Sequence, residues 1–468
     1  MKHPATVAFA AALLALALPL VACTPSPDDP ATESYDGETV TIPPITVPTE
    51  PDDRVLTDLS PYVERLDALF AGSTPAPAAD FTYEVLPPAP DDPLQDTVGS
   101  VKITGYTGGE IVVVIPDTIE ELPVTAIAPD AFAGKGSIKA MSVPDTVTSI
   151  GVGAFRGCTA MTSLRTPVYT CEDAPYFGAL FGATSYESGA SAVPNKLSTL
   201  VLTDGVAIPD YAFYACRSLE VISLPQTMSE LGDFAFYGCR SLAYVDTADA
   251  SVTALGERVF TGCESLLALH LPQTVTEMGP AILEGCGKLE SLTIPFVGGG
   301  EEDNSYIGYL FGASDHVFTA GYIPASLIEI TVHDGCPKIA DNAFYECASV
   351  RSITLPEGAT EIGRRAFYGC ENLATVTLPD GVFSIGDEAF CGCLRLTSVQ
   401  VSKGLNVLGV QTFMNCVSLE SVSLPVGVNH LPNSCFAGCQ SLVRVTAAGP
   451  VTLGEQVFRG CDRLTEHP

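Results

Sequence analysis

The sequence predicts a repeat solenoid, a stack of short coils with a parallel β-sheet along one face and short strands with 3-10 or helical turns along the other. Three observations predict this fold class. From about residue 130, a phenylalanine returns at steps that are mostly 23 residues long. Each one stands in the same order of cysteine, leucine, valine, proline and glycine. The composition, 46% hydrophobic and only 16% charged, supplies enough apolar surface for a continuous core.

One unit of the repeat, AFYGCENLATVTLPDGVFSIG at residues 366–386, shows how a coil is built. LxxVxL is a short strand in which alternate apolar side chains face inward. The proline that follows has no N–H for a sheet ladder and ends the strand. VxxIG makes a second contact with the core and closes on a turn glycine, while AFxxC packs inward on a helical or 3-10 turn. One unit cannot bury this surface alone, but stacked units can.

The repeat runs through the whole C-terminal part of the chain. The phenylalanine position of the repeat is occupied by Phe132, Phe155, Phe213, Phe236, Phe260, Phe344, Phe367, Phe390, Phe413, Phe436 and Phe458. Leu283 occupies it in one coil. The leucine positions predict thirteen strands, the first near residue 138 and the last near residue 442. At roughly 4.8 Å per strand, the stack is about 60 Å long.

At these residues the chain resembles the BspA type of bacterial leucine-rich repeat proteins. The resemblance covers about residues 100–468, including ITGYTGGEIVVVIPDTIEELPVTAIAPDAF at residues 103–132, which is how such arrays often begin. It implies a curved, right-handed solenoid displayed on a cell surface. Known members are associated with adhesion and with binding of host proteins, so the resemblance implies a binding function.

The first 22 residues have the pattern of an export signal peptide. A weakly basic start precedes an apolar stretch that is too short for a comfortable transmembrane helix. The stretch ends in LVAC at residues 20–23, which resembles a bacterial lipobox. That resemblance implies a lipoprotein anchored through Cys23 on the extracellular side of the bacterial cell envelope. The alternative is an ordinary secretory peptide with a chance cysteine.

Beyond the signal peptide, composition divides the chain into three parts. Residues 23–79 form an acidic Pro/Thr-rich tether whose prolines favour extended conformations. A short helix is expected inside it near residues 61–71, with Ser60 as its cap and a proline at its first position. Residues 80–130 form an N-terminal cap segment, and residues 131–468 form the solenoid.

The charge balance restricts the partners. The chain has 55 acidic and 22 basic residues, which gives a formal net charge of −33. Such a charge excludes binding to the phosphates of nucleic acids. It also excludes electrostatic adhesion to an anionic membrane surface. The expected contact with the membrane is therefore the lipid at Cys23.

Most of the 16 cysteines occupy one slot of the repeat, three residues after the phenylalanine. A residue at a fixed phase points the same way in every coil, and free cysteine is readily buried. Disulfides between coils would need Cβ atoms within about 3.5–4.5 Å, and a linear column lacks the clustered ligands of a zinc site. We therefore expect packed, reduced thiols, with no metal and no cofactor. The column consists of Cys158, Cys216, Cys239, Cys263, Cys286, Cys347, Cys370, Cys393, Cys416, Cys439 and Cys461.

Two coils are enlarged, at about residues 168–196 and 296–326, where the step between strands grows to 36 and 38 residues. Both contain GxLFGA at a constant offset of 130, which indicates that a block of about five coils was duplicated. Insertions in repeats often lie on the binding face, and aromatic side chains are common anchors. The insertion can also fold back and cover the edge of the solenoid, and the two roles can coexist. The candidate ligand contacts here are Tyr176, Phe177, Tyr186, Tyr306, Tyr309, Phe318 and Tyr322.

The outward face of the predicted sheet is polar and carries little charge. Serine and threonine dominate it, and these are simply good exposed strand residues. One patch differs, because Tyr244, Asp246 and His270 fall on adjacent coils between the two enlarged coils. These three residues are added to the candidate ligand contacts.

The function predicted from these features is binding without catalysis. The six histidines are scattered, and HExxH, GxSxG and phosphate-loop patterns are absent. The first hypothesis is a cell-surface protein that mediates adhesion by engaging an extracellular protein or glycan. The alternative is a structural scaffold of the cell envelope that self-associates as an end-to-end homodimer. It rests on the array stopping at CDRLTEHP without a polar capping repeat.

Overall fold

The computed structural model of this chain describes residues 56–88, 99–248, 250–300 and 305–468. All of them belong to one compact unit, Glu50–Pro468. The predicted export signal, Cys23 and the tether up to residue 55 lie outside the described residues. Within the described ranges, no helix is long and apolar enough to cross a bilayer.

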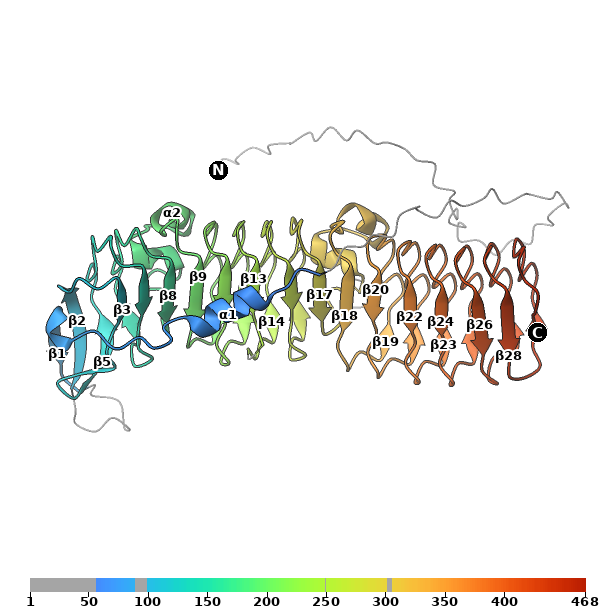
Figure 1. The fold of residues 1–468 in the computed structure, drawn as a ribbon, viewed down its shortest axis with the longest axis horizontal. Coiled ribbons are helices and arrows are strands. Elements are labelled where there is room, and N and C mark those ends of the chain that lie inside the picture. The colour runs from blue at the N-terminus through green and yellow to red at the C-terminus, as the bar shows by residue number, and fades with distance from the viewer. Residues whose placement is uncertain (1–55, 89–98, 249, 301–304) are drawn as a thin grey trace, which may run out of the picture. The chain divides into compact units, whose positions relative to one another are not determined.

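The chain winds into the predicted solenoid, in which each coil contributes one strand to a parallel sheet (Figure 1). One run of this main sheet consists of β3 (Val112–Val114), β6 (Ala140–Ser142), β8 (Ser163–Thr166), β9 (Thr199–Leu202), β11 (Val221–Ser223) and β13 (Tyr244–Asp246). The other consists of β15 (Ala268–His270), β17 (Ser291–Ile294), β18 (Glu329–Val332), β20 (Ser352–Thr354), β22 (Thr375–Thr377), β24 (Ser398–Gln400), β26 (Ser421–Leu424) and β28 (Arg444–Ala447). Thirteen of these strands lie at the predicted positions, and β3 is an additional strand in the cap segment.

The register of the main sheet aligns equivalent repeat positions. Ile222 of β11 pairs with Leu200 of β9 on one side and with Val245 of β13 on the other. All three side chains face inward and are buried. In β20, β22 and β24 the residues before and after the inward position are exposed. In these coils the sheet therefore has one face in the core and one face open to solvent.

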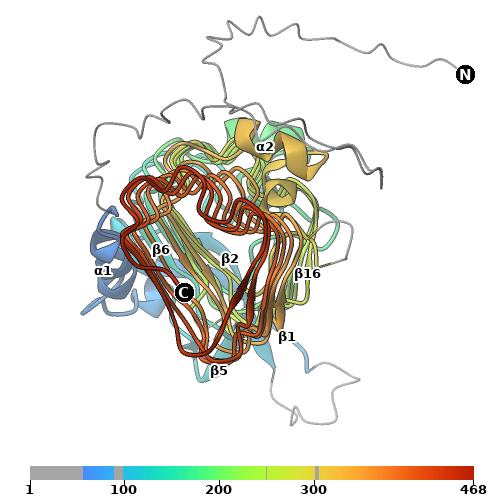
Figure 2. The same cartoon turned by 90° about the vertical axis from the view of Figure 1, so that its right-hand side faces the viewer.

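The VxxIG segments form short parallel strands on the opposite side of the coils, as the end-on view shows (Figure 2). They are β10 (Ala207–Ile208), β12 (Glu230–Leu231), β14 (Ala254–Leu255), β16 (Glu277–Met278), β19 (Lys338–Ile339), β21 (Glu361–Ile362), β23 (Ser384–Ile385), β25 (Val407–Leu408), β27 (His430–Leu431) and β29 (Thr452–Leu453). The AFxxC segments of the regular coils are hydrogen-bonded turns, not 3-10 or α-helices. The expected helical character is found instead in the enlarged coils.

The core contains a column of phenylalanine rings with the thiols beside it. The rings of Phe344, Phe367 and Phe390 stack at centroid distances of 5.3 and 4.8 Å. The thiol of Cys393 donates to the carbonyl of Phe367 in the preceding coil at 3.2 Å, and eight other column cysteines repeat this bond. The column cysteines are buried, apart from the half-buried Cys461, which confirms that they pack as a column inside the coils. Each coil is thus bonded to the coil before it through a side chain as well as the backbone.

Burial of these thiols predicts sensitivity to alkali. Burial raises the pKa of Cys216 and of Cys286 from 9 to about 12. Between these values the unfolded chain has lost the thiol proton and the folded chain keeps it, so the unfolded state binds fewer protons and stability falls as pH rises. Each such thiol removes up to about 1.4 kcal/mol of unfolding free energy per pH unit. Urea unfolding at pH 8, 9 and 10 should show this decline, and Cys216→Ala should reduce its slope; equal stability at pH 8 and 10 would contradict it.

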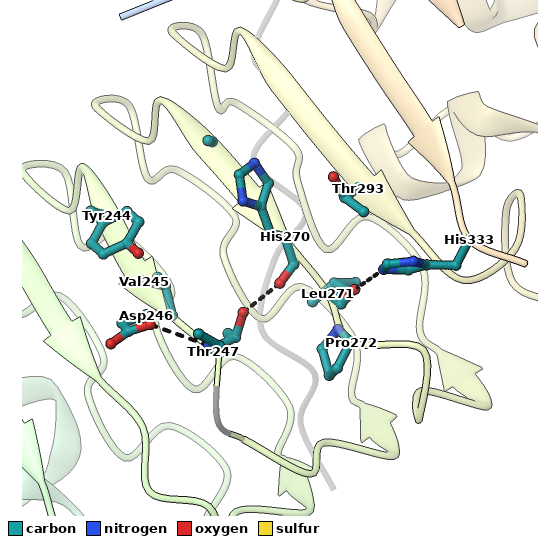
Figure 3. A pocket seen from close by; sticks show the side chains of 11 residues that line it. Tyr244, Val245, Asp246, Thr247, His270, Leu271, Pro272, Thr293 and His333 are labelled. Atoms are coloured by element: carbon teal, nitrogen blue, oxygen red, sulfur yellow. Dashed lines mark hydrogen bonds between the residues drawn. The ribbon is translucent and has the colours of Figure 1, made fainter. Parts of the chain in front are cut away.

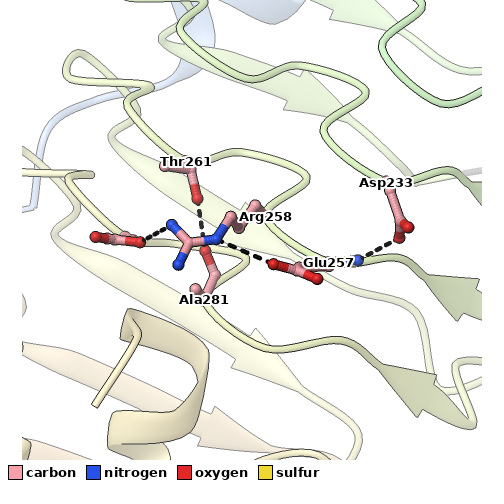
Figure 4. A network of polar contacts seen from close by, with 6 residues as sticks. Asp233, Glu257, Arg258, Thr261 and Ala281 are labelled. Carbon is pink, nitrogen blue, oxygen red and sulfur yellow. Dashed lines mark hydrogen bonds and ion pairs between the residues drawn. The ribbon is translucent and has the colours of Figure 1, made fainter. Parts of the chain in front are cut away.

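Two backbone positions in each coil lie in the left-handed region, two residues before and two residues after the phenylalanine. The first position carries a side chain in most coils, such as Arg258. Its guanidinium pairs with Glu257 at 3.1 Å and also with Glu284 of the following coil (Figure 4). In the same network Asp233 of the preceding coil accepts the N–H of Glu257 at 2.7 Å. The two left-handed positions flank the phenylalanine and interrupt right-handed helical geometry, which explains why AFxxC forms a turn and not a helix.

A matched pair of substitutions tests the backbone strain at the second left-handed position. Gly238 has φ of +71°, and a Cβ placed there would come no closer than 3.8 Å to other atoms. Ala215 occupies the same position one coil earlier with φ of +54°. Gly238→Ala should therefore lower the unfolding free energy by about 1–2 kcal/mol through backbone strain alone, and Ala215→Gly should not lower it. Denaturant unfolding measures both, and an unchanged stability of Gly238→Ala would refute the explanation.

The cap segment extends the aromatic column at the N-terminal end. Here β1 (Phe81–Leu86) pairs antiparallel with β2 (Ser100–Tyr106), and β2 pairs parallel with β5 (Leu122–Ile127). Tyr106 packs between Phe81 at 5.2 Å and Phe132 at 5.5 Å. The remaining elements of the cap and its junction with the first coil are η1 (Ala78–Asp80), β4 (Thr118–Ile119) and β7 (Ser149–Ile150). The first coil is therefore covered by aromatic and strand contacts.

The last described coil has contacts of its own. Glu466 lies beside β28, where its carbonyl accepts the N–H of Val445 at 2.8 Å and its carboxylate pairs with Arg444 at 2.8 Å. The ring of His467 lies 5.1 Å from that of Phe458. These residues cover part of the edge on which the expected end-to-end dimer depends, and the dimer stays a prediction.

Candidate functional site

The main sheet is interrupted between β13 and β15. The strands up to β13 form one hydrogen-bonded run, and those from β15 onward form another. The coil between Phe236 and Phe260 has 24 residues where its neighbours have 23, and Thr247 stands where the preceding coil has Leu224. On this face of the solenoid, one backbone bond still joins the two coils, from the N–H of Leu267 to the carbonyl of Ala243 at 3.1 Å. The extra residue and the polar substitution therefore coincide with a weakened ladder.

A hollow of about 340 Å³ lies at this interruption (Figure 3). It is lined by Tyr244, Val245, Asp246, Thr247, Ala248, Ala268, His270, Leu271, Pro272, Thr293 and His333. The three sheet-face residues singled out by the sequence, Tyr244, Asp246 and His270, line the same hollow. The sequence missed Thr247 and His333. His333 is 63 positions after His270, and only the stacking of the coil beyond the second enlargement brings the two together.

Hydrogen bonds to the backbone fix the walls of the hollow. The Thr247 hydroxyl donates to the carbonyl of His270, which bridges the interrupted ladder (Figure 3). Nε2 of His333 lies 3.0 Å from the carbonyl of Leu271, so this nitrogen carries the proton and donates it. Nε2 of His270 lies 3.3 Å from the Ser291 hydroxyl. The polar groups are thus held in place before any ligand arrives.

The electrostatics of the hollow favour neutral rings beside a carboxylate. Burial lowers the pKa of His270, Glu329 opposes that shift, and His333 adds to it. Burial and then the charge of Asp246 raise the pKa of Tyr244. At neutral pH the hollow therefore presents an uncharged imidazole and an uncharged phenol. These groups can exchange hydrogen bonds with a side chain of a partner.

The enlarged coils use their aromatic residues chiefly as core. In the first, η2 (Phe177–Phe181) places Phe177 5.0 Å from Phe213 and Phe181 6.0 Å from Phe155. The insertion therefore supplies an extra rung of the phenylalanine column. Phe177 is 1% exposed, so its prediction as a ligand contact is wrong. In the second, η4 (Ile307–Phe311) takes the same place.

Two predicted tyrosines are held inside the enlarged coils. The Tyr306 hydroxyl donates to the carbonyl of Ala313 at 3.0 Å, and Tyr306 is 8% exposed. Tyr306 is therefore also wrong as a ligand contact, because its ring and its hydroxyl are used internally. Tyr176, its counterpart, is half-buried and directs its hydroxyl at the carbonyl of Ala183 at 3.5 Å. Tyr309 is half-buried beside Tyr306, at a centroid distance of 6.3 Å.

The outer parts of the two enlarged coils have diverged. In the first, α2 (Tyr186–Ala192) stacks Tyr186 on Tyr211 at 4.6 Å and carries serines and a glutamate. In the second, η5 (His316–Gly321) and the next residue expose an apolar set, Val317, Phe318 and Tyr322, at 50, 56 and 46%. Phe318 and Tyr322 are thus accessible as predicted contacts, and Val317 was missed.

A helix of the tether lies on the open face of the main sheet. It is α1 (Ser60–Ala68), which runs across the strands between β8 and β17 in Figure 1 and beside the same sheet in Figure 2. Ser60 is the first helical residue and not the cap, which is Leu59. The N–H of Ser60 donates to the carboxylate of Asp58 at 2.9 Å. The ring of Tyr62 stacks on that of Tyr244 at 6.1 Å. The helix therefore contacts Tyr244, which also lines the hollow.

The described residues contain no group of three or more histidine, cysteine, aspartate or glutamate side chains that could hold a metal. The coil length, the parallel sheet and the column of phenylalanines and leucines define the class of the protein as a leucine-rich repeat solenoid. The BspA type Leucine rich repeat region matches residues 125–173, 193–298 and 326–465 in six copies, and the chain belongs to this family. The two internal gaps fall within the enlarged coils.

Two solved bacterial structures are similar to this chain. A leucine-rich repeat protein from Bacteroides ovatus is 22% identical, covers 79% of this chain and 98% of its own, and has a TM-score of 0.35. A leucine rich cell surface protein from Faecalibacterium prausnitzii is 23% identical, covers 81% of this chain and 96% of its own, and has a TM-score of 0.31. No curated protein matches the chain.

Proposed function

We propose that this protein is a lipid-anchored cell-surface adhesion protein that binds an extracellular protein through the open face of its main sheet. The observation that carries the proposal is the hollow of about 340 Å³ at the sheet interruption. A cleft of this size accepts a few protruding groups of a partner. Its walls are fixed by backbone hydrogen bonds, so binding costs little ordering of the protein.

The second enlarged coil supports a protein as the ligand. Val317, Phe318 and Tyr322 form an exposed apolar set, and aromatic side chains of this kind dominate binding energy in protein interfaces. The duplicated coil at α2 lacks such a set, so the fold itself does not require it. We propose that this set is a second contact with the same partner.

Matched substitutions test the hollow. His270→Ala should weaken binding of the full chain to its extracellular protein ligand at least tenfold, a loss of about 1.4 kcal/mol. Gln400→Ala changes the same outward position of β24, far along the stack, and should leave binding unchanged. The ligand is first sought by capture from extracellular-matrix proteins and from a glycan panel, and surface plasmon resonance then compares the variants. Capture of glycans alone, self-association alone, or equal losses in both variants would contradict the proposal.

The anchor is tested separately. The lipobox-like segment at residues 20–23 supports lipidation of Cys23. Cys23→Ala should move the protein from the membrane fraction to the medium, because the net charge of −33 gives the chain no other hold on an anionic surface. Fractionation with mass spectrometry measures both the location and the modification. Membrane retention of the variant, with Cys23 unmodified in the parent, would contradict the anchor.

A further inference from the structure

The open face of the main sheet is unevenly exposed. The first outward position is exposed at Ser352, Thr375 and Ser398 in the C-terminal coils. The same position is buried at Val221 of β11 and at Ala268 of β15, which are 0 and 5% exposed. The α1 segment lies across this part of the sheet in Figure 1, and Figure 2 shows it beside the same sheet. The tether therefore occupies the surface on which the hollow opens.

Three contacts hold the segment there. Arg65 pairs with Glu220 at 2.7 Å. The N–H and the hydroxyl of Thr57 both donate to the carboxylate of Glu290, at 2.6 and 2.9 Å. Between these two ends, Tyr62 stacks on Tyr244, which also forms a wall of the hollow. The contacts span the coils from β11 to β17, across the sheet interruption.

These contacts suit reversible docking. No residue of α1 is buried, and Val63 is 40% exposed. The side chains of Arg65 and Glu220 are 38 and 44% exposed, and an ion pair this accessible to water is weak. A segment that buries none of its own helical residues can leave the sheet without exposing an apolar core.

We propose that residues 57–68 form a displaceable strap on the binding face, and that the partner displaces it with the same chemistry: a short helix that offers a cation to Glu220 and an aromatic ring to Tyr244. The inference rests on the proposed function for its partner, but the strap itself is tested without one. The charge of the strap weakens its binding to the sheet. It carries Asp58, Glu64 and Asp67 against the single Arg65, and the chain to which it docks has a net charge of −33. A helix that keeps the ring and the cation without these acids binds the same face more tightly.

Hydrogen exchange on the full chain tests the docking of the strap. Arg65→Glu places two carboxylates together at Glu220 and should at least double the exchange rates of the amides in residues 57–68. The charge swap Arg65→Glu with Glu220→Arg should restore the slow rates. Ala68→Gln changes an exposed residue of α1 without changing its charge, and should leave the exchange rates unchanged. Equal exchange in the parent and Arg65→Glu, or no recovery in the swap, would overturn the strap.

A peptide in trans tests the chemistry of the partner. The probe is a fluorescein-labelled peptide of residues 56–71 with Glu64→Gln and Asp67→Asn. If the strap is closed nine-tenths of the time, the peptide should bind the Arg65→Glu chain about tenfold more tightly than the parent chain. Adding Tyr244→Ala should abolish that binding. Equal affinity for both chains, or binding to neither, would overturn the proposal, whereas failure of His270→Ala to weaken ligand capture would count against the proposed function alone.

Discussion

The structure depends on the bonding of each coil to its two neighbours. A single coil has too little apolar surface to fold, and its backbone bonds are completed only by the coils on either side. The phenylalanine column carries this dependence through the core, since the ring and carbonyl of Phe367 are met by the ring of Phe390 and the thiol of Cys393. Every coil needs this stacking on both sides, so an inserted segment is compatible with the fold only if it continues the phenylalanine column. Phe177 and Phe181 do this in the first enlarged coil.

The candidate site arises where this regularity fails. One extra residue and the change to Thr247 interrupt the sheet ladder, and the Thr247 hydroxyl bridges the interruption. A hollow forms on the sheet face because adjacent strands no longer share a continuous ladder. The irregular coil costs the stack some bonding, yet it places Tyr244, His270 and His333 around one space. A uniform solenoid offers no comparable feature, which is why the site is discrete although the surface is repetitive.

The segment that contains α1 contacts the same strands that line the hollow. A long acidic segment that only lifted the solenoid from a membrane would need no contact with the sheet. Here Arg65 pairs with Glu220, and Tyr62 stacks on Tyr244. Tyr244 therefore contacts α1 and also lines the hollow. Under the proposed function, a ligand that displaces α1 from the sheet would also release residues 57–68 from their contacts with the solenoid. Under the same proposal, the net charge of −33 would favour a ligand that carries positive charge.

The sequence by itself determined the solenoid, the position of thirteen strands and the thiol column, because these depend on spacing along the chain and every coil repeats the same local rules. It also singled out Tyr244, Asp246 and His270, which stand out against a face of serine and threonine. Only the tertiary structure decided the fates of Phe177 and Tyr306, since an aromatic residue in an insertion can face the core or the solvent with equal local preference. It alone brought His333 to the hollow and Tyr62 onto Tyr244, because both contacts join segments that sequence spacing leaves unrelated.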